Sequence, residues 1–280
     1  MIKFMLAARK RPDDTQENYF YNWGIIHVAL MLTTPAVMKV FKRYDQHYTI
    51  NGINSDKLIH PLSEMAWDNF ADHWIEKEDD FDIILYHPDY VIRMQPHRFG
   101  DHNFIVEVTE ENFVHQRPDF ASGGVKLVHF LKKQPHLSHA EFAEVWRDKH
   151  APVVLEAANG LLRKYMQSSH LPLDPKRLKG TLFEMGGVGQ FSGVEEFWFD
   201  SLADLYQFCE QSRAAIAASE ANFVEAAGSI SMVTAERVIY DFTLPEGQRS
   251  PLPAVLAEGS LETAVYNQGL RDWNKVDGGD

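Results

Sequence analysis

Histidines spaced one helical turn from aromatic residues are the feature of this sequence most suggestive of chemistry. Phe142, Trp146 and His150 follow one another at intervals of four, which places them on one face of a predicted helix with His150 in its last turn. Trp23 and His27 repeat the last two positions. The negative end of a helix dipole favours a protonated imidazole, and histidine changes charge near neutral pH. Each histidine is therefore a candidate general acid or base, although a hydrogen-bonded core histidine gives the same pattern.

Two further histidines interrupt predicted strands. His129 lies between Leu127 and Leu131, where a buried imidazole must find a partner or face a cavity. If that face of the sheet points into an interior cavity, His129 is a candidate catalytic residue. If it lies beneath helices, His129 is a satisfied core residue. His73, beside Trp74, raises the same two alternatives.

Tyrosine, tryptophan and acidic side chains could complete a pocket around these histidines. A tyrosine hydroxyl can donate to a substrate carbonyl, although a core tyrosine with a polar tip gives the same pattern. Asp72 and Glu196 alternate with tryptophan along predicted strands, which favours an inward orientation. We predict catalytic roles for His150, His129, His27, His73 and Tyr165, and substrate-binding roles for Trp146, Trp23, Tyr44, Trp198, Trp74 and Glu196.

The thirteen histidines form no strong metal-binding motif. None forms His-x-x-x-His or His-x-His, and His136-x-x-His139 lies at a predicted turn and helix start, where solvated residues are common. The single cysteine, Cys209, leaves no partner for a disulfide within the chain, and its helical surroundings indicate a core residue. We therefore predict no metal and no cofactor. A haem held by His150 or His27 is the alternative.

The sequence repeats itself, so two copies of one element order must position these residues. Residues 2–30 align with residues 125–153 without a gap, and Lys3 falls on Lys126. A repeat of roughly 110 residues has the size of a domain rather than of a solenoid unit. Further aligned pairs are Tyr44 with Tyr165, Gln46 with Gln167, Trp74 with Trp198, and Val108 with Val233.

Each copy is predicted to have the order βαββαβ. Residues 125–131 form a predicted strand, and Ser138 followed by Glu141 is a capping box that begins a helix. This order is the ferredoxin-like plait, whose antiparallel sheet has one uncovered apolar face. We predict an α+β protein in which two plaits, fused in tandem, pack face to face as an intramolecular dimeric α-β barrel around a chamber. The predicted domains are 1–118 and 119–244, with an extension at 245–280.

Three segments fall outside the plait pattern. Residues 49–65 and 170–189 are longer than the hairpin that a plait needs, which predicts binding loops or lids that differ between the halves. A strand rather than a helix follows residues 186–189, so this glycine-rich stretch predicts a flexible loop and not a phosphate site. Residues 261–273 carry an apolar stripe that predicts a short docking helix.

The second half resembles a known family. Its residues are similar to the EthD-type members of the dimeric α-β barrel superfamily at Val125 to Lys133, Ser138, Phe142, Trp146, His150 to Pro152, Tyr165 and Glu196 to Asp200. The first half keeps Tyr19, Trp23, His27, Tyr44 and Asp72 to Trp74, but lacks Ala-Pro after the histidine. The resemblance covers residues 2–243 and implies the fold. It implies the reaction loosely, because the superfamily includes polyketide cyclases, decarboxylases, dehydratases, isomerases, cofactor-free monooxygenases and haem enzymes.

Charge and composition limit the partners. The net charge of -13, without clusters of lysine and arginine, argues against nucleic acid. Neither a membrane-spanning apolar run nor a signal-peptide pattern is found, so we expect a cytoplasmic protein. We expect a monomer with pseudo-dimeric halves or a homodimer.

The acid-base groups and the resemblance together predict an enzyme. We expect a cofactor-independent lyase that eliminates, decarboxylates or cyclises a small hydrophobic, aromatic or polyketide-like molecule through an enol or phenolate. The reaction class comes from the resemblance. The alternatives are a cofactor-free or haem-dependent monooxygenase, and a non-catalytic accessory protein of a degradation pathway that binds a small molecule.

Overall fold

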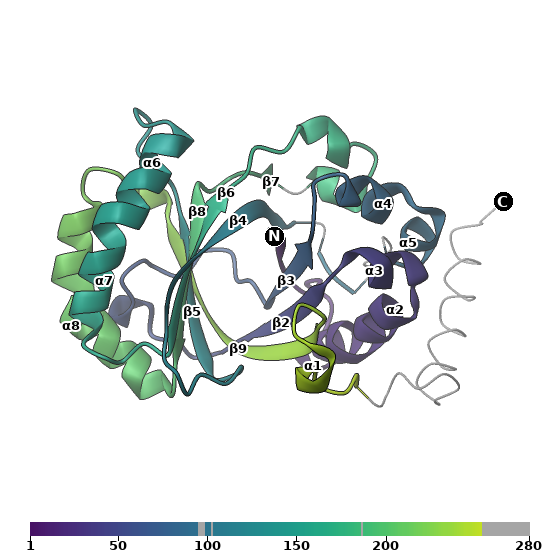
Figure 1. The fold of residues 1–280 in the computed structure, drawn as a ribbon, viewed down its shortest axis with the longest axis horizontal. Coiled ribbons are helices and arrows are strands. Elements are labelled where there is room, and N and C mark those ends of the chain that lie inside the picture. The colour runs from purple at the N-terminus through teal and green to yellow at the C-terminus, as the bar shows by residue number, and fades with distance from the viewer. Residues whose placement is uncertain (95–98, 102, 186, 254–280) are drawn as a thin grey trace.

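The chain folds into a closed barrel with a layer of helices on each side (Figure 1). The computed structural model describes residues 1–94, 99–101, 103–185 and 187–253. Eight antiparallel strands follow one another in the order β1-β3-β2-β9-β5-β8-β6-β4, and β4 pairs with β1 to close the barrel. These strands are β1 (Ile2–Ala8), β2 (Arg43–Thr49), β3 (Asn69–Ile75), β4 (Ile105–Gln116), β5 (Val125–Leu131), β6 (Lys164–His170), β8 (Gly193–Phe199) and β9 (Ile230–Asp241). The predicted fold, two fused plaits in a dimeric α-β barrel, is confirmed.

The last strand of each half joins the two halves. β4 pairs with β1 over residues 105–110 and with β6 over residues 109–116. β9 likewise pairs with β5 over residues 230–235 and with β2 over residues 234–241. Each crossing contains a register break. The duplication therefore extends to the way in which the halves are joined.

The helices cover the outer faces of the barrel. In Figure 1, the first-half helices lie on one side and the second-half helices on the other. Ser138 and Glu141 form the predicted capping box, and Cys209 is fully buried in α8 as predicted for a core residue. The helices are α1 (Gln16–Tyr21), η1 (Asn22–His27), α2 (Val28–Thr33), α3 (Pro35–Val40), α4 (Asp80–Tyr86), α5 (Pro88–Arg93), α6 (His139–Val145), η3 (Trp146–His150), α7 (Ala151–Ala158) and α8 (Leu202–Glu220), where η1 and η3 are π-helical.

The two long insertions are exchanged between the halves. The first, residues 50–68, contains the short helix η2 (Ser55–Lys57) and packs Leu58 into the helix-sheet core of the second half. The second, residues 171–192, contains η4 (Pro175–Leu178) and η5 (Leu182–Met185) and packs Phe183 into the core of the first half. Each insertion thus covers the partner half.

The barrel interior is packed with side chains. At one end a cluster of apolar residues from both halves fills it, including Phe70, Phe130 and Met232. The predicted catalytic histidines do not line this interior, contrary to the expectation of a barrel chamber that carries them. Side chains alternate along a strand, and the four predicted catalytic histidines all lie on the side that faces the helices.

Ionic groups from both halves meet elsewhere in the interior. Lys3 Nζ lies 2.5 Å from Glu196 Oε2 and 3.2 Å from Asp72 Oδ2. Lys126 Nζ lies 2.5 Å from Glu196 Oε1 and 3.4 Å from Asp72 Oδ2. The repeat aligns the two lysines with each other and the two acids with each other. Each lysine therefore bridges carboxylates of both halves across the barrel.

Other features outside the plaits differ from expectation. Gly187 and Val188 form a short strand, β7, parallel to β4, where the sequence predicted a flexible loop. Two further short helices are η6 (Ala226–Gly228) and η7 (Glu246–Gln248). The predicted helix at 261–273 lies outside the described residues. Within the described part, none of the helices has the length and hydropathy needed to cross a bilayer.

Candidate active site

Three histidines and two glutamates gather between the sheet and the helices of the second half. His129 comes from β5, Glu195 from β8, His150 from η3 and Glu220 from the end of α8. The fifth, His60, comes from the first-half insertion, and its ring lies 4.8 Å from that of His129. All five side chains are buried. We call this group the His-Glu cluster.

Glu195 is the centre of the His-Glu cluster. Its Oε1 accepts hydrogen bonds from Trp146 Nε1 at 2.5 Å and Tyr165 Oη at 2.6 Å, and lies 3.3 Å from His150 Nε2. Its Oε2 lies 3.6 Å from His129 Nδ1 and has no hydrogen-bond partner among the described residues. Burial opposes ionisation, but His150 and His129 together outweigh it and hold the pKa of Glu195 well below its usual range.

His150 is paired with this carboxylate rather than with a helix end. The helix continues through α7, so the prediction that His150 lies in the last turn is wrong. Burial disfavours the charged imidazole, but Glu195 overcomes it and raises the pKa of His150. His129 differs, because burial dominates and lowers the pKa of His129. The surroundings therefore shift the pKa values of the two imidazoles in opposite directions.

Buried glutamines give both halves a π-helical turn. Gln167 Nε2 donates to Trp146 O at 3.0 Å and to Tyr165 Oη at 2.9 Å. In the first half, Gln46 Nε2 donates to Trp23 O at 3.0 Å and to the equivalent tyrosine, Tyr44, at 2.8 Å. A π-helical turn widens the helix locally and is frequent at functional sites. The sequence alignment paired these glutamines, but their role was missed.

The first half shares the glutamine, the tyrosine and the π-helical turn, but it has no counterpart of the Glu195 carboxylate. In the strand register, Ala71 occupies the position of Glu195 and Leu6 that of His129. Trp23, His27 and His73 border a cavity of about 20 Å³. The structure thus brings His129, His150, Trp146 and Tyr165 together in one half, and His27, His73, Trp23 and Tyr44 in the other.

His73 is packed as a core residue. Its ring stacks on Tyr44 with centroids 4.7 Å apart and the planes inclined by 10°. Its Nδ1 lies 3.3 Å from Phe4 O, and burial lowers the pKa of His73 to about 4. This histidine is therefore neutral at physiological pH.

The remaining predicted substrate-binding residues lie inside the barrel. Trp74 donates to Glu111 Oε2 at 2.7 Å, and its repeat partner Trp198 donates to Glu236 Oε1 at 3.0 Å. Glu196 binds the two interior lysines. The inward orientation of Glu196 is confirmed. Glu196 points into the barrel, whereas the His-Glu cluster lies on the opposite face of the sheet, beneath the helices.

Sequence reasoning selected Glu196 and overlooked its neighbour Glu195. The strand register supplies the missing signal, because Glu195 lies directly opposite His129. If His129 faces the helices, Glu195 must face them as well. No pattern in the sequence comparable to this strand register identifies His60 or Glu220. Only tertiary folding brings these two residues to the cluster.

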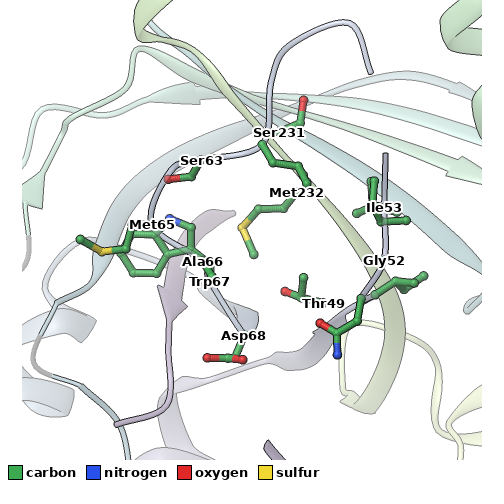
Figure 2. A pocket seen from close by; sticks show the side chains of 14 residues that line it. Thr49, Gly52, Ile53, Ser63, Met65, Ala66, Trp67, Asp68, Ser231 and Met232 are labelled. Carbon is green, nitrogen blue, oxygen red and sulfur yellow. The ribbon is translucent and has the colours of Figure 1, made fainter. Parts of the chain in front are cut away.

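Figure 2 shows an open pocket of about 190 Å³ that is lined in part by Ser63 and Met65, which follow His60 in the first-half insertion. Its lining includes Met232 from β9, Thr49 from the end of β2, and Trp67 before β3. Ser231, also in the lining, donates through Oγ to His60 O at 2.7 Å. The pocket therefore adjoins the insertion that closes the His-Glu cluster.

Gly193 fixes the position of Trp146. A Cβ built on Gly193 would lie 2.6 Å from Trp146 Cη2 and 3.2 Å from Phe142 Cε1, closer than side chains tolerate. We expect Gly193→Ala to lower the free energy of unfolding by about 1–3 kcal/mol, because overpacking displaces the indole that binds Glu195. Urea unfolding measures this, with Gly247→Ala as control, since its Cβ meets nothing within 4 Å. Equal losses in both variants would contradict this packing.

The surroundings of His150 do not suit its use as an axial ligand of a haem iron. His150 Nε2 would have to point at the iron, but Glu195 Oε1 lies 3.3 Å and Glu220 Oε1 4.0 Å from it. Two buried carboxylates thus occupy the space that a porphyrin ring would need.

Comparisons with known protein sequences identify one family. The sequence model of the EthD domain matches residues 134–227, which contain His150, Glu195 and Glu220. Residues 134–227 are therefore similar to an EthD domain, as the resemblance in the sequence indicated. Among curated protein sequences none matches significantly.

Several solved structures resemble this chain over most of its length. An anthrone oxidase-like protein matches with a TM-score of 0.56 and 10% identity, covering 85% of this chain and 92% of that one. A variant of chlorite dismutase from Candidatus Nitrospira defluvii matches with a TM-score of 0.45 and 11% identity, covering 83% and 91%. A haem-binding protein from Thermus thermophilus matches with a TM-score of 0.43 and 9% identity, covering 84% and 90%. Identities this low concern the fold alone.

Proposed function

We propose that the chain is an enzyme of the lyase type whose catalytic centre is the His-Glu cluster, acting on a small aromatic or polyketide-like molecule. One observation carries the proposal. Both ring nitrogens of His129 and Oε2 of Glu195 are buried without a hydrogen-bond partner among the described residues, beside the His150–Glu195 pair. Buried polar atoms without partners are costly, and a bound substrate group would satisfy them.

The cluster offers an acid and a base on neighbouring side chains. His129 would accept a proton from the carbon next to a substrate carbonyl, which leaves an enolate. In its protonated form, which Glu195 favours, His150 would stabilise the enolate oxygen and donate a proton to a departing hydroxyl group, which leaves as water. Aromatic rings from Trp146, Phe197 and Phe223 surround the cluster and suit a planar, apolar substrate.

An oxygenase would begin with the same proton abstraction. The anthrone oxidase-like structure shares this fold, and an aromatic enolate can react with dioxygen as well as eliminate a leaving group. The two functions differ in what they consume, because only an oxygenase takes up oxygen.

A substrate screen tests the proposal. The full chain would be incubated with aromatic β-hydroxy ketones and β-keto acids while mass spectrometry follows products and an electrode follows oxygen. We expect loss of water or carbon dioxide without oxygen uptake, and about 10²–10⁴-fold slower turnover in His129→Gln. His136→Gln, an exposed change, serves as control. Oxygen consumption that matches product formation would favour the oxygenase, and full turnover by His129→Gln would remove the assigned base.

A further inference from the structure

Three ligand atoms in the His-Glu cluster lie close enough to share one ion. His150, Glu195 and Glu220 each present one such atom, and all three atoms lie within 4.8 Å of one another. His150 Nε2 is 3.3 Å from Glu195 Oε1 and 4.0 Å from Glu220 Oε1. Ligands bound at about 2.0–2.2 Å from a metal ion are about 3–4 Å apart. The two distances from His150 match that range, and the ligand atoms of the two glutamates lie within 4.8 Å of each other.

Among the described residues, no lysine or arginine pairs with the two buried carboxylates of this group. Within the described residues, the ion-pair partners of Glu195 and Glu220 are all histidines. The acids of the barrel interior, by contrast, are bound by Lys3 and Lys126. Two buried carboxylates without a lysine or arginine carry a high desolvation cost, which a divalent cation would offset.

The surrounding residues hold the three side chains as a second shell holds metal ligands. His150 Nδ1 lies 2.9 Å from Ser219 Oγ, which directs Nε2 towards the glutamates. His60 Nε2 lies 3.1 Å from Glu220 Oε1. Hydrogen bonds of this kind orient metal ligands and raise their basicity. Two atoms aimed into the cluster, His150 Nε2 and Glu195 Oε2, lack any hydrogen-bond partner among the described residues.

We propose that His150, Glu195 and Glu220 bind one divalent first-row transition-metal ion. One imidazole and two carboxylates suit Zn²⁺, Mn²⁺ or Fe²⁺, whereas Mg²⁺ and Ca²⁺ prefer oxygen ligands alone. Three protein ligands leave positions open for water or substrate. The inference uses the centre of the proposed function but does not require the lyase reaction. Metal binding needs the neutral form of His150, so in the metal-bound chain the ion, rather than a protonated His150, would stabilise the enolate oxygen. It replaces the expectation of a metal-free chain, which considered only histidines close in sequence.

Equivalent positions elsewhere in the chain lack these properties. In the first half, Ala71 removes the carboxylate from the site near His27. A second group of ligand-type residues, Asp45, His47 and Glu236, lies in the barrel. There Arg43 already binds Asp45, and Lys126 Nζ lies 3.3 Å from His47 Nε2. Protein cations compensate those acids, so this second group needs no metal ion.

Metal titration of the full chain tests the proposal without any substrate. Chelator-treated protein would be titrated with Zn²⁺, Mn²⁺ or Co²⁺, and bound metal measured by elemental analysis after gel filtration. We expect one ion per chain, a rise in melting temperature, and visible absorption from bound Co²⁺. His150→Gln and Glu220→Gln should abolish tight binding. His27→Gln, the matched change in the first half, should bind like the unmodified chain.

A milder variant keeps the test decisive if the ligand variants unfold. Ser219→Ala removes only the hydroxyl beside His150 Nδ1 and should weaken binding about 10–100-fold while the circular dichroism spectrum stays native. Failure of the unmodified chain to bind any of the three metals would overturn the proposal. So would binding that survives His150→Gln and is lost in His47→Gln. Neither result depends on whether the chain proves to be a lyase.

Discussion

Replacing Lys126 by methionine is expected to lower the free energy of unfolding by about 3–5 kcal/mol. Lys126 Nζ contacts both Glu196 and Asp72, and all three side chains are buried in the barrel. Methionine keeps an unbranched side chain but removes the charge. Lys3 is then left as the cation for two buried carboxylates. Urea unfolding followed by circular dichroism and fluorescence measures the loss.

Two further variants separate charge from surface effects. Lys39→Met, on an exposed part of α3, should change the free energy of unfolding by less than about 0.5 kcal/mol. Adding Glu196→Leu to Lys126→Met should recover part of the loss, because the uncompensated carboxylate is removed. If Lys126→Met is as stable as Lys39→Met, the interior cluster does not join the halves as described.

His73→Phe is expected to remove an acid-dependent loss of stability of about 3 kcal/mol. The pKa of His73 is about 4 in the folded chain and about 6.5 in the unfolded chain. As the pH falls from 6.5 towards 4, the unfolded chain binds a proton that the folded chain excludes, so stability falls. Above pH 6.5 the imidazole is neutral in both states and contributes no pH dependence. Unfolding measured at pH 7 and pH 4 gives the difference.

The repeat supplies the reverse substitution as a control. Phe197 stacks on Tyr165 with ring centroids 4.8 Å apart, as His73 does on Tyr44. Phe197→His should therefore add an acid-dependent loss to the second half. If the unmodified chain and His73→Phe lose the same stability between pH 7 and pH 4, the assigned pKa of His73 is wrong.

The fold could be predicted from the sequence because local patterns and duplication agree. The capping box at Ser138 and the strand pattern at 125–131 each predict one element, and the repeat predicts every element twice. The exchange of the two insertions could not be predicted. Their lengths were visible, but the contact of Leu58 with the second half depends on tertiary packing.

The candidate site could be predicted only in part. The helical spacing identified Trp146 and His150, and the odd position of His129 in a strand identified an unusual histidine. The sequence predicted a catalytic His129 if it faced the barrel and a hydrogen-bonded core residue if it faced the helices. His129 faces the helices, yet both of its ring nitrogens lack a hydrogen-bond partner among the described residues. Glu220 and His60 come from segments whose approach no local pattern specifies.

Duplication followed by divergence explains why the proposed centre lies mainly in one half. Both halves keep the glutamine that binds the π-helical turn, so the scaffold is shared. Glu195 and His129 have Ala71 and Leu6 as counterparts, while the first half contributes His60 across the interface. The proposed centre therefore needs both halves, although most of its residues belong to one.

A crystal structure of the full chain grown with Co²⁺, with anomalous scattering recorded at the cobalt edge, tests the central claim most directly. The account predicts one strong peak between His150, Glu195 and Glu220, beneath His60 and outside the barrel. A peak beside His47 in the barrel, or one near His27 in the first half, would contradict it.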